Sequence, residues 1–423
     1  MQSLFQKLIL AWKDATLRKR LLFVAALLLL FRLLAAIPIP GVDLARLEQF
    51  FSNNQFLGLL NIFSGGGLSN LSIVMLGVGP YITGSIIMQL LTMMSPKLKA
   101  LYHEEGEAGR ARFAQYSRLL TVPLALIQSF GFLVLLERQG VVPELSLFHT
   151  LTNVILITGG SLLLMWLGEL MTEYGIGNGV SLIIFAGIVA SIPAAVGQLA
   201  FTFEPGSIPL YLGFLAAAAA VVLGVVVVTE AERPIPVTYA KRVRGNRVFG
   251  GVSTYLPLRV NQAGVIPIIF ALSILLFPQM IATFLAAFDN GALQRIASLL
   301  QAIFANAWVY ASLYFVLVFL FTYFYTAVTF DPDTIANNLQ KNGAFIPGVR
   351  PGPQTSAHIT QVLTRITLVG AVFLGLVAVL PLAMQGITGN ANLAIGGTAL
   401  LIVVSVVLDF VKKVEAQVSM REY

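Results

Sequence analysis

The chain has 423 residues, of which 57% are hydrophobic and 11% are charged, and its mean hydropathy is +0.86. Soluble domains carry about a quarter charged residues, so this composition excludes an ordinary soluble protein and predicts a polytopic membrane protein. Cysteine is absent, which excludes disulfides and cysteine-based metal or redox sites. The net charge of +7 would suggest nucleic-acid binding in a soluble chain, but basic cytoplasmic loops explain it better in a membrane protein.

The first twenty residues have a basic amphipathic pattern and lead into an apolar span predicted at residues 21–39. Such a segment is typical of a helix that lies on the cytoplasmic membrane surface. A cleavable signal peptide is the alternative interpretation of this stretch. It is disfavoured because the apolar run is long, contains Arg32 and lacks a small-residue cleavage site ahead of Pro38.

The stretch from residue 56 to residue 96 holds two apolar segments of unequal length. Gly65, Gly66 and Gly67 separate a short piece, residues 56–63, from a longer piece at residues 73–94. At ~1.5 Å per residue, only the longer piece can cross a ~30 Å hydrocarbon layer. The pattern predicts a segment that enters the membrane and turns back, and irregular backbone at that depth is tolerated only beside protein or a water-filled cavity.

Further apolar runs bring the number of predicted spans to ten; they lie at residues 116–136, 150–171, 180–199, 208–229, 262–286, 308–330, 362–384 and 395–411. Of the 26 Lys and Arg residues, all but Arg32, Arg46, Arg138 and Arg295 fall on one side of this arrangement. This excess predicts that both termini are cytoplasmic. The spans divide into two halves, residues 21–200 and 201–411, between a surface segment at residues 1–20 and a tail at residues 412–423. The second half would start from the opposite side of the membrane, as inverted halves do.

Two long cytoplasmic loops, residues 230–261 and 331–361, have patterns of their own. Apolar and polar residues alternate on both sides of Arg244, which predicts a β-hairpin that turns at Gly245 and Asn246. The second loop holds a predicted short helix at residues 332–342, followed by a tip rich in Gly and Pro. Structured loops on one face are typical of docking surfaces, and simple solvated loops are the alternative.

The predicted spans contain few ionisable groups, which bears on two classes of function. An ion-coupled transporter usually buries such groups near mid-membrane, whereas Arg32, Glu169, Glu173 and Asp409 lie close enough to a boundary or a neighbouring helix for structural roles. No hydrolase motif is present, and the three histidines fall in connecting segments. A secondary transporter with a re-entrant hairpin stays open as the alternative, and an intramembrane enzyme is disfavoured.

Small residues lie beside branched aliphatic residues in several spans, at residues 77–80, 84–85, 175–179, 263–264 and 396–398. Small residues let helices approach closely or slide past each other. A conduit that apolar side chains close can gate by dewetting, without any charge. The pattern therefore suits a substrate that is variable and often apolar.

Stretches over nearly the whole chain resemble the SecY family, the central subunits of the bacterial protein-conducting channel. They are AAIPIPG (35–41), NIFSGGGLSNLSIVMLGVGPYITGSIIMQLL (61–91), EEGEAGRARFAQYSR (104–118), WLGELMTEYGIGNGVSLIIFAGIVA (166–190), YAKRVRGNRV (239–248), STYLPLRVNQAGVIPIIFA (253–271) and NLQKNGAFIPGVRPGPQT (338–355). The resemblance implies an all-α polytopic membrane protein with ten transmembrane helices in two inverted pseudo-symmetric halves, plus a short re-entrant plug helix at about residues 57–70. It also implies an inner-membrane channel that is no enzyme and has no cofactor of its own.

The resemblance implies roles for individual residues as well. The plug would include Leu59, Leu60, Ile62, Phe63, Ser64, Gly65, Gly66 and Gly67. A hydrophobic pore ring would be formed by Val78, Ile82, Val180, Ile184, Ile269 and Ile402. The second and third spans would part from the seventh and eighth to open a lateral gate, whose polar residues would be Thr83, Gln89, Asn261 and Gln262.

The two cytoplasmic loops resemble docking sites for the ribosome and for the ATPase SecA. Arg350 is the first candidate contact, followed by Arg242, Arg244 and Arg247. Relatives are expected to carry adjacent basic residues after the hairpin glycine, whereas only the second residue after Gly245 is basic here, so the contacts of the hairpin tip stay open. Other implied partners are SecE, SecG, polypeptides that bear signal sequences and membrane lipid, with SecDF and YidC as further candidates.

Overall fold

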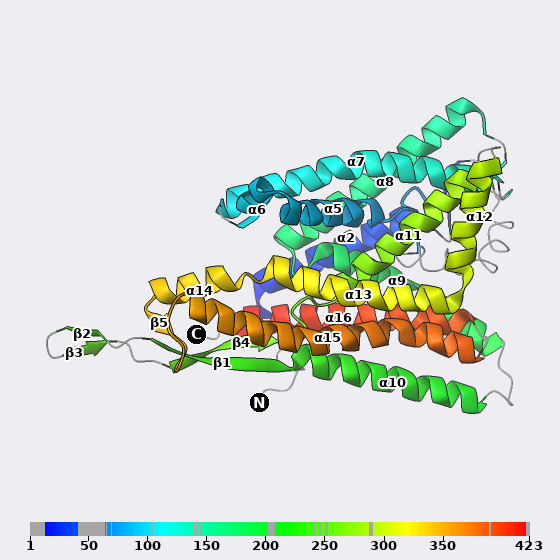
Figure 1. Cartoon of the computed structure of the whole chain (residues 1–423). Coiled ribbons are helices and arrows are strands. Elements are labelled where there is room, and N and C mark those ends of the chain that lie inside the picture. The colour runs from blue at the N-terminus through cyan, green and yellow to red at the C-terminus, as the bar shows by residue number, and fades with distance from the viewer. Residues whose placement is uncertain are drawn as a thin grey trace.

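A computed structural model of the chain describes residues 13–40, 64, 66–68, 70–103, 105–138, 140, 142–143, 145–201, 208–239, 242–244, 247–249, 253–286, 291–388 and 391–419. Most of its helices are long and run roughly parallel to one another (Figure 1). They are α2 (Ala15–Ala35), α5 (Gly79–Met94), α6 (Pro96–His103), α7 (Gly106–Arg138), α8 (Leu147–Tyr174), α9 (Gly179–Phe201), α10 (Ile208–Glu230), α11 (Ile266–Ala286), α12 (Gly291–Ala305), α13 (Ala307–Thr329), α14 (Pro332–Lys341), α15 (Pro353–Thr388) and α16 (Ala391–Ser419).

Each of the ten predicted spans coincides with one of these helices, which confirms the predicted all-α membrane architecture. Within the described residues, four stretches are long and apolar enough by composition to cross a membrane: Gly106–Glu137, Leu147–Tyr174, Ala307–Lys341 and Pro353–Leu380. The number of ten crossings therefore stays a prediction.

The helices form two groups that follow the chain. α2, α5, α7, α8 and α9 pack with one another, and so do α10, α11, α13, α15 and α16. Figure 1 shows α5, α7 and α8 on one side of the molecule and α10, α13, α15 and α16 on the other. Contacts between the groups include those of α11 with α5 and α7 and those of α16 with α9. One apolar core crosses this boundary, because buried residues of both groups belong to it.

The second predicted span is shorter as a helix than its apolar sequence suggested. α5 begins at Gly79, and residues 73–78 form consecutive turns that run into it. Backbone pairing with the segment after α2 replaces helical hydrogen bonds: the Ile39 N–H donates to the Leu71 carbonyl at 2.8 Å, and the Ile73 N–H donates to the Ile37 carbonyl at 3.0 Å. Irregular backbone deep in a membrane protein needs such internal partners.

A small extramembrane unit lies at the end of the bundle where α10 ends and α15 begins, here called the basic end (Figure 1). β1 (Glu232–Tyr239) pairs antiparallel with β4 (Ser253–Arg259) and with β5 (Ala344–Phe345). β2 (Arg242–Arg244) pairs with β3 (Arg247–Phe249), which confirms the predicted hairpin. α14 confirms the predicted short helix, and this unit has a separate core that includes Ile235, Leu258 and Ile359.

Candidate functional site

The six residues of the predicted ring come together in the main apolar core. Val78 precedes α5 and Ile82 lies on it, Val180 and Ile184 lie on α9, Ile269 lies on α11, and Ile402 lies on α16. Five of them are less than 7% exposed, and Val180 packs against the same core while partly exposed. Four helices from both groups therefore contribute these branched aliphatic side chains to one core. That the six residues form a ring around a pore stays a prediction.

A cavity of about 310 Å³ lies directly beside the ring, toward the basic end. Its walls come mainly from the start of α9, the segment before α11 and residues 405–413 of α16, with single residues from α10, β4 and α13. Ser181, Val265 and Val406 line it, and they lie one helical turn from Ile184, Ile269 and Ile402 respectively. The cavity and the residues of the predicted ring on α9, α11 and α16 are therefore neighbours on the same three segments of the chain.

Two of the polar side chains that line the cavity are buried and unsatisfied. Asn261 is 5% exposed and Ser405 is 7% exposed. Neither the Asn261 Oδ1 nor the Ser405 Oγ has a hydrogen-bond partner within the described part of the chain. Buried polar atoms are nearly always paired, so these two acceptors mark a place where a donor from outside the protein can bind.

The segment that leads into α5 is held from two sides. The Asn70 Nδ2 donates to the Ala35 carbonyl at 3.3 Å, which ties it to the end of α2. The Ser161 Oγ of α8 donates to the Gly77 carbonyl at 2.9 Å in a fully buried position. Gly160 lets α8 come close, because a Cβ there would lie 2.0 Å from the Ile73 carbonyl oxygen.

Arg32 contacts the glycine turn of the predicted plug. Gly66 has a φ of +82°, and a Cβ on it would lie 3.3 Å from Arg32 Nη1. Any larger residue at position 66 would be strained in its backbone and crowded by the guanidinium. Ser64, Gly66 and Gly67 are described here, whereas the plug residues Leu59, Leu60, Ile62, Phe63 and Gly65 lie outside the described residues.

The four predicted gate residues separate into two places. Thr83 is buried on α5, and Gln89 lies one to two turns further along, where its Nε2 donates to the Ser85 Oγ at 3.4 Å. Asn261 and Gln262 precede α11 and line the cavity. The helices themselves meet as the gate hypothesis requires, since α11 packs against both α5 and α7.

The acidic residues near the span ends mostly form surface ion pairs. Glu169 accepts from Arg118 at 2.7 Å, and Asp409 pairs with Lys413 one turn later at 2.7 Å. Glu173 is exposed. Such pairs contribute little to stability, ~0–1 kcal/mol, and they fit the structural roles that the sequence suggested for Glu169 and Asp409.

The predicted docking arginines lie on the extramembrane unit. Arg350 is exposed in a tight turn after β5, where its carbonyl accepts from the Thr355 Oγ1 at 3.0 Å. Arg242 and Arg244 lie on β2, and Arg247 lies on β3 opposite Arg244. All four therefore belong to one end of the molecule.

Sequence reasoning missed the residues that position the ring and the cavity acceptor on α16. Gly160 and Ser161 hold the backbone before Val78, and the Gly159-Gly160-Ser161 cluster inside an apolar span was the available signal. Ser405 carried no such signal, because a lone serine in a span usually bonds to its own helix.

Comparisons with known proteins agree with this architecture. The profile of the SecY family matches residues 72–411. A protein of Streptomyces scabiei named "Protein translocase subunit SecY" is 42% identical over 98% of this chain and 97% of its own length. A protein of the same name from Mycobacterium bovis is 42% identical over 97% of both.

Solved structures show the same fold at low sequence identity. A structure described as "The structure of a protein conducting channel" has a TM-score of 0.66 at 19% identity, over 97% of this chain and 94% of that one. Sec61 in the canine ribosome-channel complex has a TM-score of 0.61 at 18% identity and the same coverage. With a family profile over most of its length and relatives above 40% identity, the chain belongs to the SecY family.

Proposed function

We propose that this chain is the central subunit of a protein-conducting channel, which passes unfolded secretory polypeptides across the inner membrane. The observation that carries the proposal is that six branched aliphatic residues from four helices share one core, next to a cavity lined in part by polar residues. The names of its relatives, translocase subunits, support the same function.

An apolar ring suits a substrate of variable sequence. It binds no particular side chain, and it resists water and ions by dewetting when no chain is present. In this proposal the ring comprises Val78, Ile82, Val180, Ile184, Ile269 and Ile402, and the segment at residues 57–70 plugs the external side. For a SecY protein of known structure, the plug domain is described as stabilising the closed state of the channel and maintaining a membrane seal.

A lateral gate would open between α5 and α7 on one side and α11 and α13 on the other. In this proposal, the packing of α11 against α5 and α7 would be the closed arrangement. A signal sequence, apolar over ~10 to 15 residues, would part these helices and pass sideways into lipid. Thr83, Gln89, Asn261 and Gln262 would be the polar groups that its entry displaces.

The energy for transport would come from partners, because the channel catalyses no reaction. The extramembrane unit with Arg350, Arg242, Arg244 and Arg247 is the proposed docking surface for SecA and the ribosome. Arginine suits both, since its planar guanidinium pairs with carboxylate or phosphate through two hydrogen bonds. In this proposal the basic end and both termini would lie in the cytoplasm, and SecE and SecG would complete the complex.

The gate can be tested by replacing Asn261 with Leu. Because Asn261 is buried beside the cavity and its Oδ1 has no partner among the residues that the structure describes, an apolar side chain there should change how readily weak signal sequences open the gate. The measurement is the export of precursors with defective signal sequences, relative to a precursor with an intact one. Unchanged stringency with normal export would remove Asn261 from the gate.

A further inference from the structure

We propose that the cavity beside the ring binds the backbone of the passing polypeptide through the Asn261 Oδ1 and the Ser405 Oγ. The inference rests on the proposed function and adds a substrate-binding site to it. Both atoms are buried, both line the cavity, and both are acceptors without a hydrogen-bond partner in the described part of the chain.

The chemistry of the two atoms selects the ligand. The Asn261 Oδ1 can only accept and therefore needs a hydrogen-bond donor, and the Ser405 hydroxyl can accept from a donor as well. A polypeptide of any sequence offers backbone N–H groups at regular spacing. An extended chain in a narrow apolar ring cannot pair these groups with itself, and an unpaired buried N–H is costly. The two oxygen atoms line the cavity next to the proposed ring, and they would pair with a backbone N–H group as it leaves the cavity and enters the ring.

The positions of Ser405 and Asn261 support the proposal that a backbone N–H group binds in the cavity before it enters the ring. Ser405 lies one helical turn from Ile402 on α16, and Asn261 lies in the turn that starts α11, ahead of Ile269. The two acceptors thus come from different helices and line one cavity next to the same ring. A single net hydrogen bond is weak, about 1 kcal/mol, so the chain would be held briefly and still move on.

Proline provides the test, because it has no backbone N–H. A secretory precursor is stalled in proteoliposomes by a folded C-terminal domain, with either an alanine tract or a proline tract at the depth of the cavity. ATP is then removed, and the rate at which the stalled chain slides back is measured. With the parent channel, the alanine tract should slide back ~5-fold more slowly than the proline tract.

The channel variants separate hydrogen bonding from the stiffness of proline. In a channel that carries both Ser405→Ala and Asn261→Leu, the proline tract and the alanine tract should slide back at nearly equal rates, so the ratio of the two rates should fall toward one. Ser191→Ala is the matched control, because its Oγ already donates to the Ile188 carbonyl at 2.7 Å. An identical ratio in the parent and in the double variant would overturn the backbone site. Failure of any precursor to enter the parent channel would instead overturn the proposed function.

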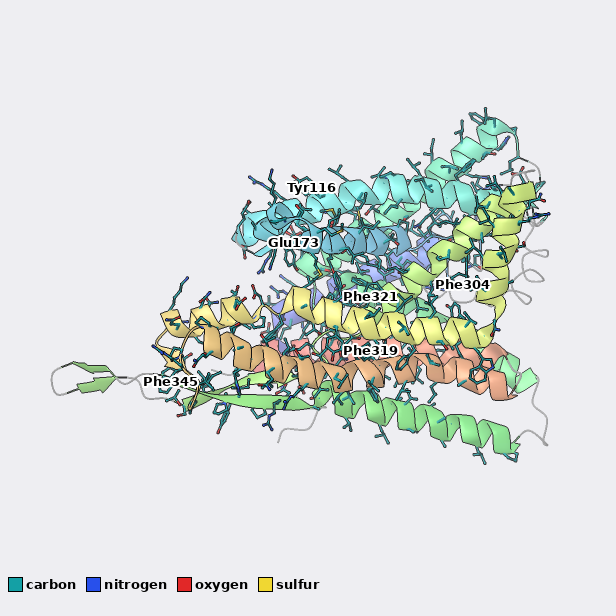
Figure 2. The ribbon with its side chains drawn as sticks, viewed as in Figure 1. Tyr116, Glu173, Phe304, Phe319, Phe321 and Phe345 are labelled. Atoms are coloured by element: carbon teal, nitrogen blue, oxygen red, sulfur yellow. The ribbon has the colours of Figure 1, made fainter. Side chains whose placement is uncertain are left out.

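A second observation, independent of the channel function, concerns α12. This helix lies crosswise to the spans at the end of the molecule opposite the strands (Figure 1). Leu293, Ala297, Leu300 and Phe304 are its partly or fully buried residues, and Phe304 packs against the main core (Figure 2). They recur at helical spacing, so this stripe faces the protein.

Two further stripes flank it. The residues one position earlier, Ile296, Leu299 and Ile303, are 48%, 64% and 48% exposed although they are aliphatic. The residues one position later, Gln294, Ser298 and Gln301, are polar and exposed. One residue corresponds to ~100° of rotation on a helix, so protein-facing, apolar and polar stripes follow one another around the axis.

The geometry points to the lipid of the external leaflet as the partner of the apolar stripe. α12 is separated from the span α13 by Asn306 alone, and α13 opens with Trp308, which is 76% exposed. Tryptophan at the end of a span is typical of the membrane interface. The exposed aliphatic stripe thus continues the lipid-facing surface of α13, where Val316 and Leu320 are also exposed.

Spin labels on single cysteines test this placement in the complex reconstituted into lipid vesicles, because the chain has no native cysteine. Labels at Ile296→Cys, Leu299→Cys and Ile303→Cys should collide with oxygen more often than with a water-soluble nickel chelate. Labels at Ser298→Cys and Gln301→Cys should show the reverse. Equal access of the chelate to all five positions would overturn the proposal, and so would exclusion of both reagents from the aliphatic stripe.

Discussion

Gly160 is the residue at which a single methyl group should disturb the ring most. An alanine Cβ there would lie 2.0 Å from the Ile73 carbonyl oxygen and 2.7 Å from its carbon, whereas ordinary contact begins at 3.4 Å. The backbone before α5 would have to move by about 1.4 Å, and overpacking of this kind costs ~1–3 kcal/mol. Because Val78 lies five residues after Ile73 in the same segment, the displacement should disturb the proposed ring.

Gly159 offers the matched control on the same helix. A Cβ at Gly159 would meet no atom of the described residues within 4 Å, and alanine is favoured over glycine in a helix by ~0.5–1 kcal/mol. Gly159→Ala should therefore keep or raise the midpoint of thermal unfolding of the purified complex, while Gly160→Ala lowers it. In proteoliposomes without substrate, only Gly160→Ala should increase ion leak. Equal stability and equal leak in the two variants would refute the close packing of α8 on this segment.

Two further predictions concern the same region. Ser161→Ala removes the buried donor to the Gly77 carbonyl and leaves that oxygen unpaired, so the free energy of unfolding should fall by ~1–3 kcal/mol; an unchanged denaturation midpoint would show that the bond is not formed. Arg32→Cys should raise resting ion leak, because the guanidinium beside Gly66 is lost. Treatment with aminoethyl methanethiosulfonate, which restores a positive charge, should reduce the leak, and the neutral methyl reagent should not. Equal effects of both reagents would exclude a role for the charge.

The sequence predicted the helices well because apolar runs are a local property. All ten spans coincide with helices, and the hairpin at residues 242–249 and the helix after Asp331 are confirmed. The predicted first residues of helices were less accurate where tertiary contacts decide where the helix begins. α5 begins six residues later than the apolar run, because the backbone before it bonds to the end of α2 and to α8.

α12 was missed for a physical reason. Its apolar residues form two stripes, one that faces the protein and one that is exposed. The residues of its polar stripe interrupt the apolar run, so the sequence did not predict a membrane span there. The six ring residues could be named only through the family resemblance, since branched aliphatic residues fill every span. That they share one core is a property of the fold, and their role as a pore lining stays a prediction.

The cavity could not be predicted from the sequence because its walls come from distant parts of the chain. Asn178, Asn261, Ser405 and Asp409 reach it from three separate elements or turns. Nothing in the local pattern around Ser405 distinguishes it from a serine that bonds to its own helix.

The measurement that tests the central claim most directly uses a single cysteine at Ile82, a residue of the proposed ring that is 6% exposed in the main core. The variant is reconstituted with SecA and ATP, and a precursor that carries one cysteine is stalled halfway through translocation. A disulfide between Ile82→Cys and the precursor, seen only with the stalled chain, is the predicted result. Continued translocation without any crosslink at Ile82, Ile184 or Ile269 would contradict the proposed pore, and absence of translocation would favour a transporter instead.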